Sequence, residues 1–225
     1  MKFLLFDIDG TLLDSGGAGV RSLNLAFEEM FSVGDAFSPI SVAGKTDLQL
    51  IKECLRFHGI SYHNGVIPLF FETYVRHLKA NIGGSKGHVK KGVREALDIL
   101  KSCKDYMLGL LTGNVEEGAH VKLETFGLRS YFEIGAFGSE DEDRNRLLPR
   151  AVEKLYRRSS VTMDFRDCVV IGDTPRDVEC AQRYGARAVA VATGPFSCAE
   201  LLATGADAVF ADLSDTGEFL AVLER

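Results

Sequence analysis

Short, unbroken runs of apolar residues recur along the chain. The first, Lys2–Phe6 (KFLLF), is followed at once by the polar segment 7–11. A run without polar alternation is typical of a strand that is buried on both faces of a parallel sheet. The same pattern predicts four further strands, at residues 106–111, 168–171, 186–192 and 206–210.

Helical periodicity fills most of the chain between these strands. Apolar residues spaced three and four apart predict helices at residues 92–102, 115–126, 147–158, 177–184 and 198–202. Strands that alternate with helices indicate the α/β class with a parallel sheet. We expect a core of three layers, α/β/α.

One long segment interrupts this alternation. Residues 16–85 contain helical periodicity at Ala18–Phe31, 47–58 and 66–82, and no convincing buried strand. A return to the sheet after about 70 residues is long for one crossover. We therefore predict a helical cap at 16–85 inserted into a core made of 1–15 and 86–225; the alternative is that these helices simply cover the sheet.

Composition narrows the possible partners and the compartment. The 26 basic and 32 acidic residues give a net charge of −6, which argues against a nucleic-acid or anionic-membrane binder but allows a local site for a small phosphorylated metabolite. No apolar stretch is long enough for a membrane span, and no signal peptide is evident. Five cysteines without a Cys-x-x-Cys pair fit a reducing, cytoplasmic location.

Polar residues follow three of the predicted strands. Asp7 and Asp9 follow the first, Thr112 follows the second, and Asp173 follows the third. Ligands of open α/β sheets bind at the carboxyl ends of the strands, so these side chains should converge on one edge. Crowded carboxylates need a cation or a bound proton, and oxygen-only ligands favour Mg²⁺. A carboxylate beside Mg²⁺ can attack phosphorus, and a second one can transfer a proton.

The residues next to these carboxylates are of the types that bind an anion such as phosphate. Gly10 and Thr11 permit a tight turn whose N–H groups face a phosphate, while Gly113 and Asn114 open a helix with free N–H groups. Any one of these clusters alone would be read as turn and N-cap residues. Their shared position after buried strands favours a functional site.

At these residues the chain resembles the haloacid dehalogenase superfamily of hydrolases, in its phosphoglycolate phosphatase and β-phosphoglucomutase branch. The resemblance spans nearly the whole chain and rests on Asp7-Ile8-Asp9-Gly10-Thr11, on Thr112-Gly113-Asn114 and on Gly172-Asp173-Thr174-Pro175-Arg176-Asp177. It implies a Rossmann-like core with an inserted α-helical cap that closes over the site.

The resemblance also implies a role for each matching residue. Asp7 is the nucleophile, Asp9 the acid and base, and Thr112 holds the phosphate. Asp7, the backbone carbonyl of Asp9 and Asp173 hold Mg²⁺, and Asp177 lies behind them or binds through water.

The chain departs from the family at the third motif, where a lysine is usual. Residues 138–149 contain no lysine, so Arg144 or Arg146 must supply the cation. We favour Arg144, because it leaves Leu147 in the apolar face of the next helix and its forked charge can serve both phosphate and Asp7. The alternative is that both arginines solvate an acidic loop. Lys45 is a candidate substrate-binding residue of the cap rather than a Schiff-base lysine.

These observations predict a Mg²⁺-dependent phosphatase of small phosphorylated metabolites that works through an aspartyl phosphate. Phosphoglycolate is the favoured substrate by resemblance. The alternatives are a sugar phosphomutase and, in another class, a phosphate-binding module without turnover. We expect a monomer or a homodimer.

Overall fold

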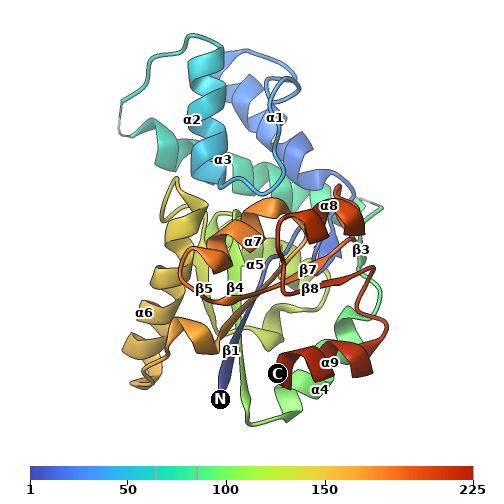
Figure 1. Ribbon diagram of the computed structural model, residues 1–225. Coiled ribbons are helices and arrows are strands. Elements are labelled where there is room, and N and C mark those ends of the chain that lie inside the picture. Colours follow the sequence, from blue (N-terminus) through green and yellow to red (C-terminus); the bar gives the residue numbers. More distant parts are fainter. Residues whose placement is uncertain (64, 85, 225) are drawn as a thin grey trace.

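A six-stranded parallel sheet forms the centre of the molecule (Figure 1). The computed structural model describes residues 1–63, 65–84 and 86–224. The strands run in the order β5-β4-β1-β6-β7-β8. Their bounds are Lys2–Phe6 for β1, Tyr106–Thr112 for β4, Ile134–Phe137 for β5, Cys168–Gly172 for β6, Arg187–Val191 for β7 and Ala208–Phe210 for β8.

Strand β1 lies between β4 and β6, and its last residue fixes the position of the polar side chains. Phe6 pairs with Leu110 on one side and with Ile171 on the other. Since all three strands run the same way, the segments that begin at Asp7, Thr112 and Asp173 leave the sheet at the same edge. The register therefore brings together residues that are more than 160 positions apart in the sequence.

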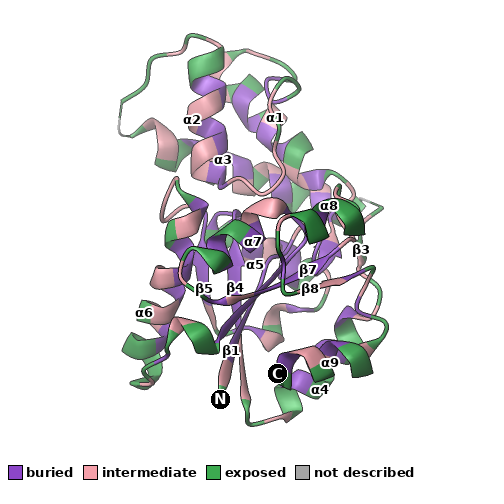
Figure 2. Ribbon diagram, in the orientation of Figure 1, coloured by how far each residue is buried: buried purple, intermediate pink, exposed green. Residues whose placement is uncertain are grey.

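Helices cover both faces of the sheet, which explains the unbroken apolar pattern of β1. Leu4 and Phe6 pack on one side and Phe3 and Leu5 on the other. In Figure 2 the strands are buried, while the outer surfaces of the helices are exposed. The first side carries α4 (Val93–Ser102), α5 (Glu116–Thr125) and α9 (Thr216–Glu224), and the second carries α6 (Leu147–Ser159), α7 (Pro175–Gln182) and α8 (Cys198–Ala203).

Three helices form a cap above this core: α1 (Ala18–Phe31), α2 (Asp47–Phe57) and α3 (Val66–Asn81). They share their own apolar core, in which the rings of Phe27, Phe37 and Phe70 contact one another. The chain leaves the core and returns to it through a two-stranded antiparallel pair, β2 (Leu13–Asp14) and β3 (His88–Val89). This pair joins the segment that leads into the cap to the segment that leads back to the core. Short 3₁₀ turns complete the chain at Ile82–Gly84, Arg129–Tyr131, Arg144–Arg146 and Phe165–Asp167.

The predicted α/β fold with a parallel sheet is confirmed, and the predicted strands and helices lie within two residues of the observed ones. Four helices and strands were not predicted, among them the short strands β2 and β3. Strand β5 has four residues, two of them the small Gly135 and Ala136, so it lacks a strong apolar signal. Helix α9 was also not predicted. The boundaries of the cap at 16 and 85 stay a prediction, and residue 85 lies outside the described residues.

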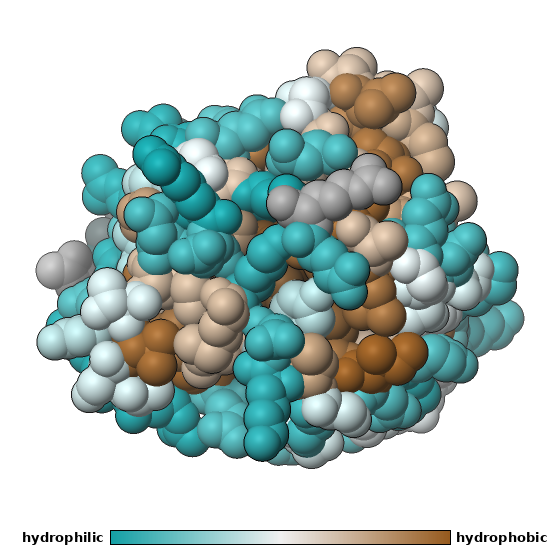
Figure 3. Space-filling model, turned by 60° about the horizontal axis from the view of Figure 1, so that its bottom comes forward, coloured by the Kyte–Doolittle hydropathy of each residue, from teal (hydrophilic) through white to brown (hydrophobic). Residues whose placement is uncertain are grey.

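None of the described helices is both long and apolar enough to cross a membrane. Seen from the end opposite the cap, hydrophilic and hydrophobic residues are interspersed on the surface (Figure 3).

The turn before α4 generates a stability prediction. Gly92 has a φ of 78°, and a Cβ there would lie 2.0 Å from the carbonyl carbon of Leu213. Gly185 has a φ of 73° but no atom within 4 Å of the same position. We expect Gly185→Ala to lower the free energy of unfolding by about 1–2 kcal/mol and Gly92→Ala by roughly twice that or more. Denaturant unfolding of both variants measures the difference, and equal losses would contradict the clash.

Candidate active site

Three buried carboxylates meet at the edge of the sheet where β1 and β6 end. Asp7 follows β1, Asp173 follows β6, and Asp177 lies in the first turn of α7. One oxygen of each lies within 4.8 Å of the others, and all three residues are buried. The structure thus brings together the acidic side chains that the sequence placed at strand ends.

One buried cation pairs with two of these carboxylates. The Nη2 atom of Arg144 lies 2.5 Å from Oδ1 of Asp177 and 3.3 Å from Oδ2 of Asp7, and the Arg144 side chain is 3% exposed. Arg146 is 69% exposed and lies 3.8 Å from Asp141. Of the two candidates for the missing lysine, Arg144 is therefore the one that lies beside Asp7.

Burial makes this group of carboxylates costly to ionise. It raises the pKa of Asp7 to about 6, and the nearby Arg144 charge only partly opposes the shift. The pKa of Asp173 is raised well above its ordinary value, by burial first and then by the charges of Asp7 and Asp177. One guanidinium is too little charge for three buried carboxylates, so the site favours a further cation.

The donor set fits Mg²⁺. All candidate ligands are oxygens, which is the chemistry that Mg²⁺ prefers. Asp177 is already engaged through both oxygens, because Oδ1 accepts from Arg144 and Oδ2 accepts from the N–H and hydroxyl of Thr174. Asp7 and Asp173 are the better ligands, and Asp177 is suited to hold Arg144.

Two glycines lie directly against the Asp173 carboxylate. A Cβ on Gly10 would lie 2.3 Å from Oδ2 of Asp173, and one on Gly194 would lie 1.7 Å from it. The Thr11 hydroxyl donates to Oδ1 at 2.9 Å. Sequence reasoning missed Gly194, although it lies just after a predicted strand, in the kind of position that identified the other site residues.

A second cluster surrounds the other aspartate of the first motif. Oδ2 of Asp9 accepts from Nδ2 of Asn114 at 2.8 Å and from Nζ of Lys122 at 2.5 Å. The same amide donates to the Thr112 hydroxyl at 2.8 Å, and Lys122 also donates to Oδ1 of Asn114 at 2.6 Å. Lys122 was not predicted. Its signal was its position next to Leu123, on the face of α5 that is buried.

The first residues of α2 and the loop before it dock on the core mainly through backbone groups. The N–H of Asp47 donates to the Gly113 carbonyl at 2.7 Å, and the N–H of Leu48 donates to the Gly138 carbonyl at 3.2 Å. A Cβ on Gly113 would lie 2.0 Å from the Lys45 carbonyl oxygen. The cap therefore contacts the core directly at the second motif.

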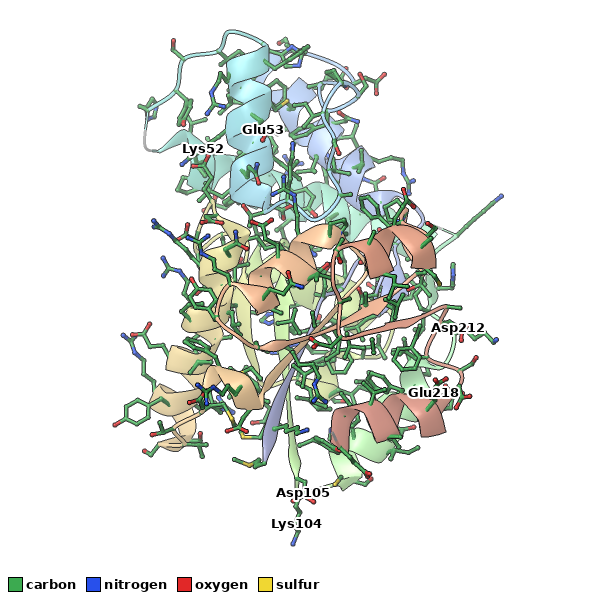
Figure 4. The ribbon with its side chains drawn as sticks, in the orientation of Figure 1. Lys52, Glu53, Lys104, Asp105, Asp212 and Glu218 are labelled. Carbon is green, nitrogen blue, oxygen red and sulfur yellow. The ribbon has the colours of Figure 1, made fainter. Side chains whose placement is uncertain are left out.

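One charged side chain of α2 adds to this contact, because Lys52 pairs with Glu142 of the core at 2.6 Å. Within the cap, Lys45 pairs with Glu53 of α2 at 2.5 Å. Figure 4 shows Lys52 and Glu53 on the cap, at the end of the molecule opposite Lys104 and Asp105. Lys45 was predicted to bind substrate; the structure places it at the wall of the cavity described next.

A cavity of about 420 Å³ separates the cap from the carboxylates. The predicted residues Asp7, Asp9, Gly10, Lys45, Gly113, Asn114, Arg144 and Asp173 line it, together with Lys90, Lys122 and Tyr74, which were not predicted as site residues. The cavity is large enough for a small phosphorylated molecule, and it is bounded by both cations and carboxylates.

Asp47 of the cap completes a helix of the core. Helix α5 begins after Val115, whose side chain cannot cap it, and the free N–H of Val115 donates instead to Oδ2 of Asp47 at 2.8 Å. Asp47 is buried, and burial raises its pKa to about 6.

Comparisons with known proteins agree with this geometry. The family model described as haloacid dehalogenase-like hydrolase matches residues 4–191. A phosphoglycolate phosphatase from Synechococcus elongatus is 26% identical over 196 residues, which cover 86% of this chain and 85% of the relative.

Solved structures share the fold. That of CbbY from Rhodobacter sphaeroides in complex with phosphate has a TM-score of 0.78 at 17% identity, with 100% of both chains covered. That of a predicted phosphoglycolate phosphatase from Haemophilus somnus has a TM-score of 0.71 at 18% identity, with 98% of each chain covered.

The buried Asp47 predicts a pH dependence of stability. Its pKa is about 6 in the folded protein against an ordinary value of 3.8. On lowering the pH from 7 to 5, the folded state gains a proton that the unfolded state does not yet bind. The folded state should gain about 1 kcal/mol from this group. Asp47→Asn keeps an acceptor for Val115 but cannot titrate, so its gain over the same range should be smaller by that amount.

Denaturant unfolding at pH 7 and pH 5 measures both gains. Identical pH dependence of the wild type and Asp47→Asn would show that Asp47 is not protonated in this range.

Proposed function

The chain belongs to the haloacid dehalogenase-like hydrolases, and we propose that it is a Mg²⁺-dependent phosphatase that hydrolyses small phosphorylated metabolites. The observation that carries the proposal is the pairing of a buried Asp7 with Arg144 at 3.3 Å on the wall of the cavity between cap and core. The family membership agrees with the resemblance seen in the sequence and makes the protein an enzyme of the hydrolase class.

The reaction has two steps, both on groups of this chain. Asp7 attacks phosphorus and the bond to the leaving oxygen breaks, while Asp9 gives that oxygen a proton. Asp9 then takes a proton from water, whose oxygen attacks the aspartyl phosphate and frees Asp7. The sum is ester plus water to alcohol plus phosphate.

Phosphoryl transfer also requires positive charge beside the phosphoryl oxygens. Asp7, the backbone carbonyl of Asp9 and Asp173 would hold Mg²⁺, which when bound supplies positive charge to the phosphoryl oxygens. Arg144 is held by Asp177 and lies 3.3 Å from Asp7, so its charge stands beside the nucleophile. Thr112 and the N–H groups of the turn at Gly10 complete the phosphate site.

Phosphoglycolate is the favoured substrate. Relatives named phosphoglycolate phosphatase cover most of the chain, and Lys45 and Lys90 on the cavity wall suit a carboxylate on the leaving group. We place the enzyme in the cytoplasm, because its five cysteines are free, and expect a monomer or a homodimer. A sugar phosphomutase would use the same Asp7 and Asp9 but would return the phosphoryl group to a sugar.

Replacement of Asp7 tests its proposed role as the nucleophile. Phosphate release from a panel that includes phosphoglycolate should require Mg²⁺, and Asp7→Asn should reduce it by about a thousandfold or more, because the amide cannot form the aspartyl phosphate. Release by the variant at the wild-type rate would contradict the mechanism. Transfer to an added sugar phosphate without net release would identify the mutase, and phosphate binding without any turnover would identify the binding module.

Replacement of Arg144 and Arg146 one at a time distinguishes the roles of the two arginines. Arg144→Met should lower kcat/KM by about a hundredfold or more, because it removes the only cation that the described structure places on Asp7. Arg146→Met, at an exposed position, should stay within about twofold. Arg144→Lys keeps a charge and should retain part of the activity if the first variant fails to fold. Equal effects of the two Met variants would contradict the assignment.

A further inference from the structure

Lys122 is an unusual lysine, because its charged end is enclosed. The residue is 3% exposed and lies on α5, on the same face as Ala119 and Leu123. Buried ammonium groups are costly unless they are fully paired. Here the ammonium donates to Oδ2 of Asp9 and Oδ1 of Asn114, at 2.5 and 2.6 Å.

The cap encloses this group from above. A Cβ on Gly19 of α1 would lie 3.3 Å from Nζ of Lys122 and 3.9 Å from the hydroxyl of Tyr74. Val121, the neighbour of Lys122 on α5, packs against the apolar core of the cap. Lys122 therefore lies between the cap and Asp9 and not at the exposed surface, where most lysines are found.

The contacts of Asp9 are divided unequally between its two oxygens. Lys122 and Asn114 both donate to Oδ2. No hydrogen bond to Oδ1 is found within the described residues, while Asp9 itself lines the cavity and its side chain is 41% exposed. Residues of the core therefore hold Oδ2, whereas Oδ1 is available to a molecule in the cavity.

We propose that Lys122 is a positioning residue that fixes the Asp9 carboxylate so that Oδ1 meets the leaving oxygen of the substrate. This proposal rests on the proposed function, because it assigns to Asp9 the proton transfer of the phosphatase reaction. Asn114 also donates to Oδ2 of Asp9 and so helps to orient this carboxylate. Because the same amide donates to the Thr112 hydroxyl, the orientation of Asp9 is coupled to the phosphate site.

Leaving groups of different acidity distinguish this role from a merely structural one. An alkyl alcohol leaves poorly without a proton, whereas 4-nitrophenolate leaves readily. Because Asp9 is also the base in the later attack of water, the readout is the first turnover, in which the alcohol leaves. Lys122→Met should lower the single-turnover rate of alcohol release about a hundredfold for the alkyl phosphate that the wild type hydrolyses fastest, and should change the rate of 4-nitrophenol release from 4-nitrophenyl phosphate by no more than about threefold. KM should stay near its wild-type value for both esters.

Three further variants complete the experiment. Lys122→Arg, which keeps a charged donor, should recover most of the alkyl phosphatase activity. In an Asp9→Asn background, Lys122→Met should change the single-turnover rate of alcohol release from the alkyl phosphate by less than about twofold, because both substitutions act on the same proton transfer. Lys104→Met, at an exposed position opposite the cap, is the matched control and should leave both activities unchanged (Figure 4).

The outcomes separate the two proposals. An equal loss of the single-turnover rate of alcohol release with both esters, a rise in KM, or additive effects with Asp9→Asn would overturn the role of Lys122 and leave the phosphatase intact. Absence of phosphate release from every ester by the wild-type protein would overturn both. Thermal melting of each variant shows whether it is folded, and a Lys122→Met protein that does not fold is replaced by Lys122→Gln in the same assays.

Discussion

The pairing of one guanidinium with two buried carboxylates organises the catalytic edge of this protein. Arg144 joins the end of β1 to the first turn of α7, through Asp7 and Asp177. Buried charges are tolerated only when they are paired, and removal of one partner leaves the others uncompensated. Asp173 forms no ion pair within the part of the chain that the structure describes, so the edge keeps an excess of negative charge that a bound ion or a proton would relieve.

The same edge depends on close contact between backbones. Gly10 and Gly194 admit the Asp173 carboxylate, and Gly113 admits the carbonyl of Lys45 from the cap. A side chain at any of these positions would displace a charged group or the cap itself. Backbone hydrogen bonds from Asp47 and Leu48 then fix the cap on the core loops.

Sequence reasoning predicted that Asp7 and Asp173 lie together, because one physical rule was sufficient for that. Parallel strands end at a common edge, so polar residues after apolar runs identified Asp7 and Asp173, and helix phase favoured Arg144. It missed β5, whose small residues give no apolar run, and it missed Lys122. The pattern on α5 treats a lysine as solvent-exposed, and only the cap folded over it changes that. Such enclosure depends on tertiary structure, and its one local signal is the position of Lys122 next to Leu123 on the buried face of α5.

Asp47 makes the cap and the core less separable than their two apolar cores suggest. The cap supplies the side chain that completes the first turn of a core helix, since Val115 cannot do so itself. A cap transplanted from another protein would bring no partner for that N–H unless it carried an acceptor at the same place. The two parts of the chain are therefore constrained to evolve together at this junction, and a graft of one onto another scaffold must carry both sides of it.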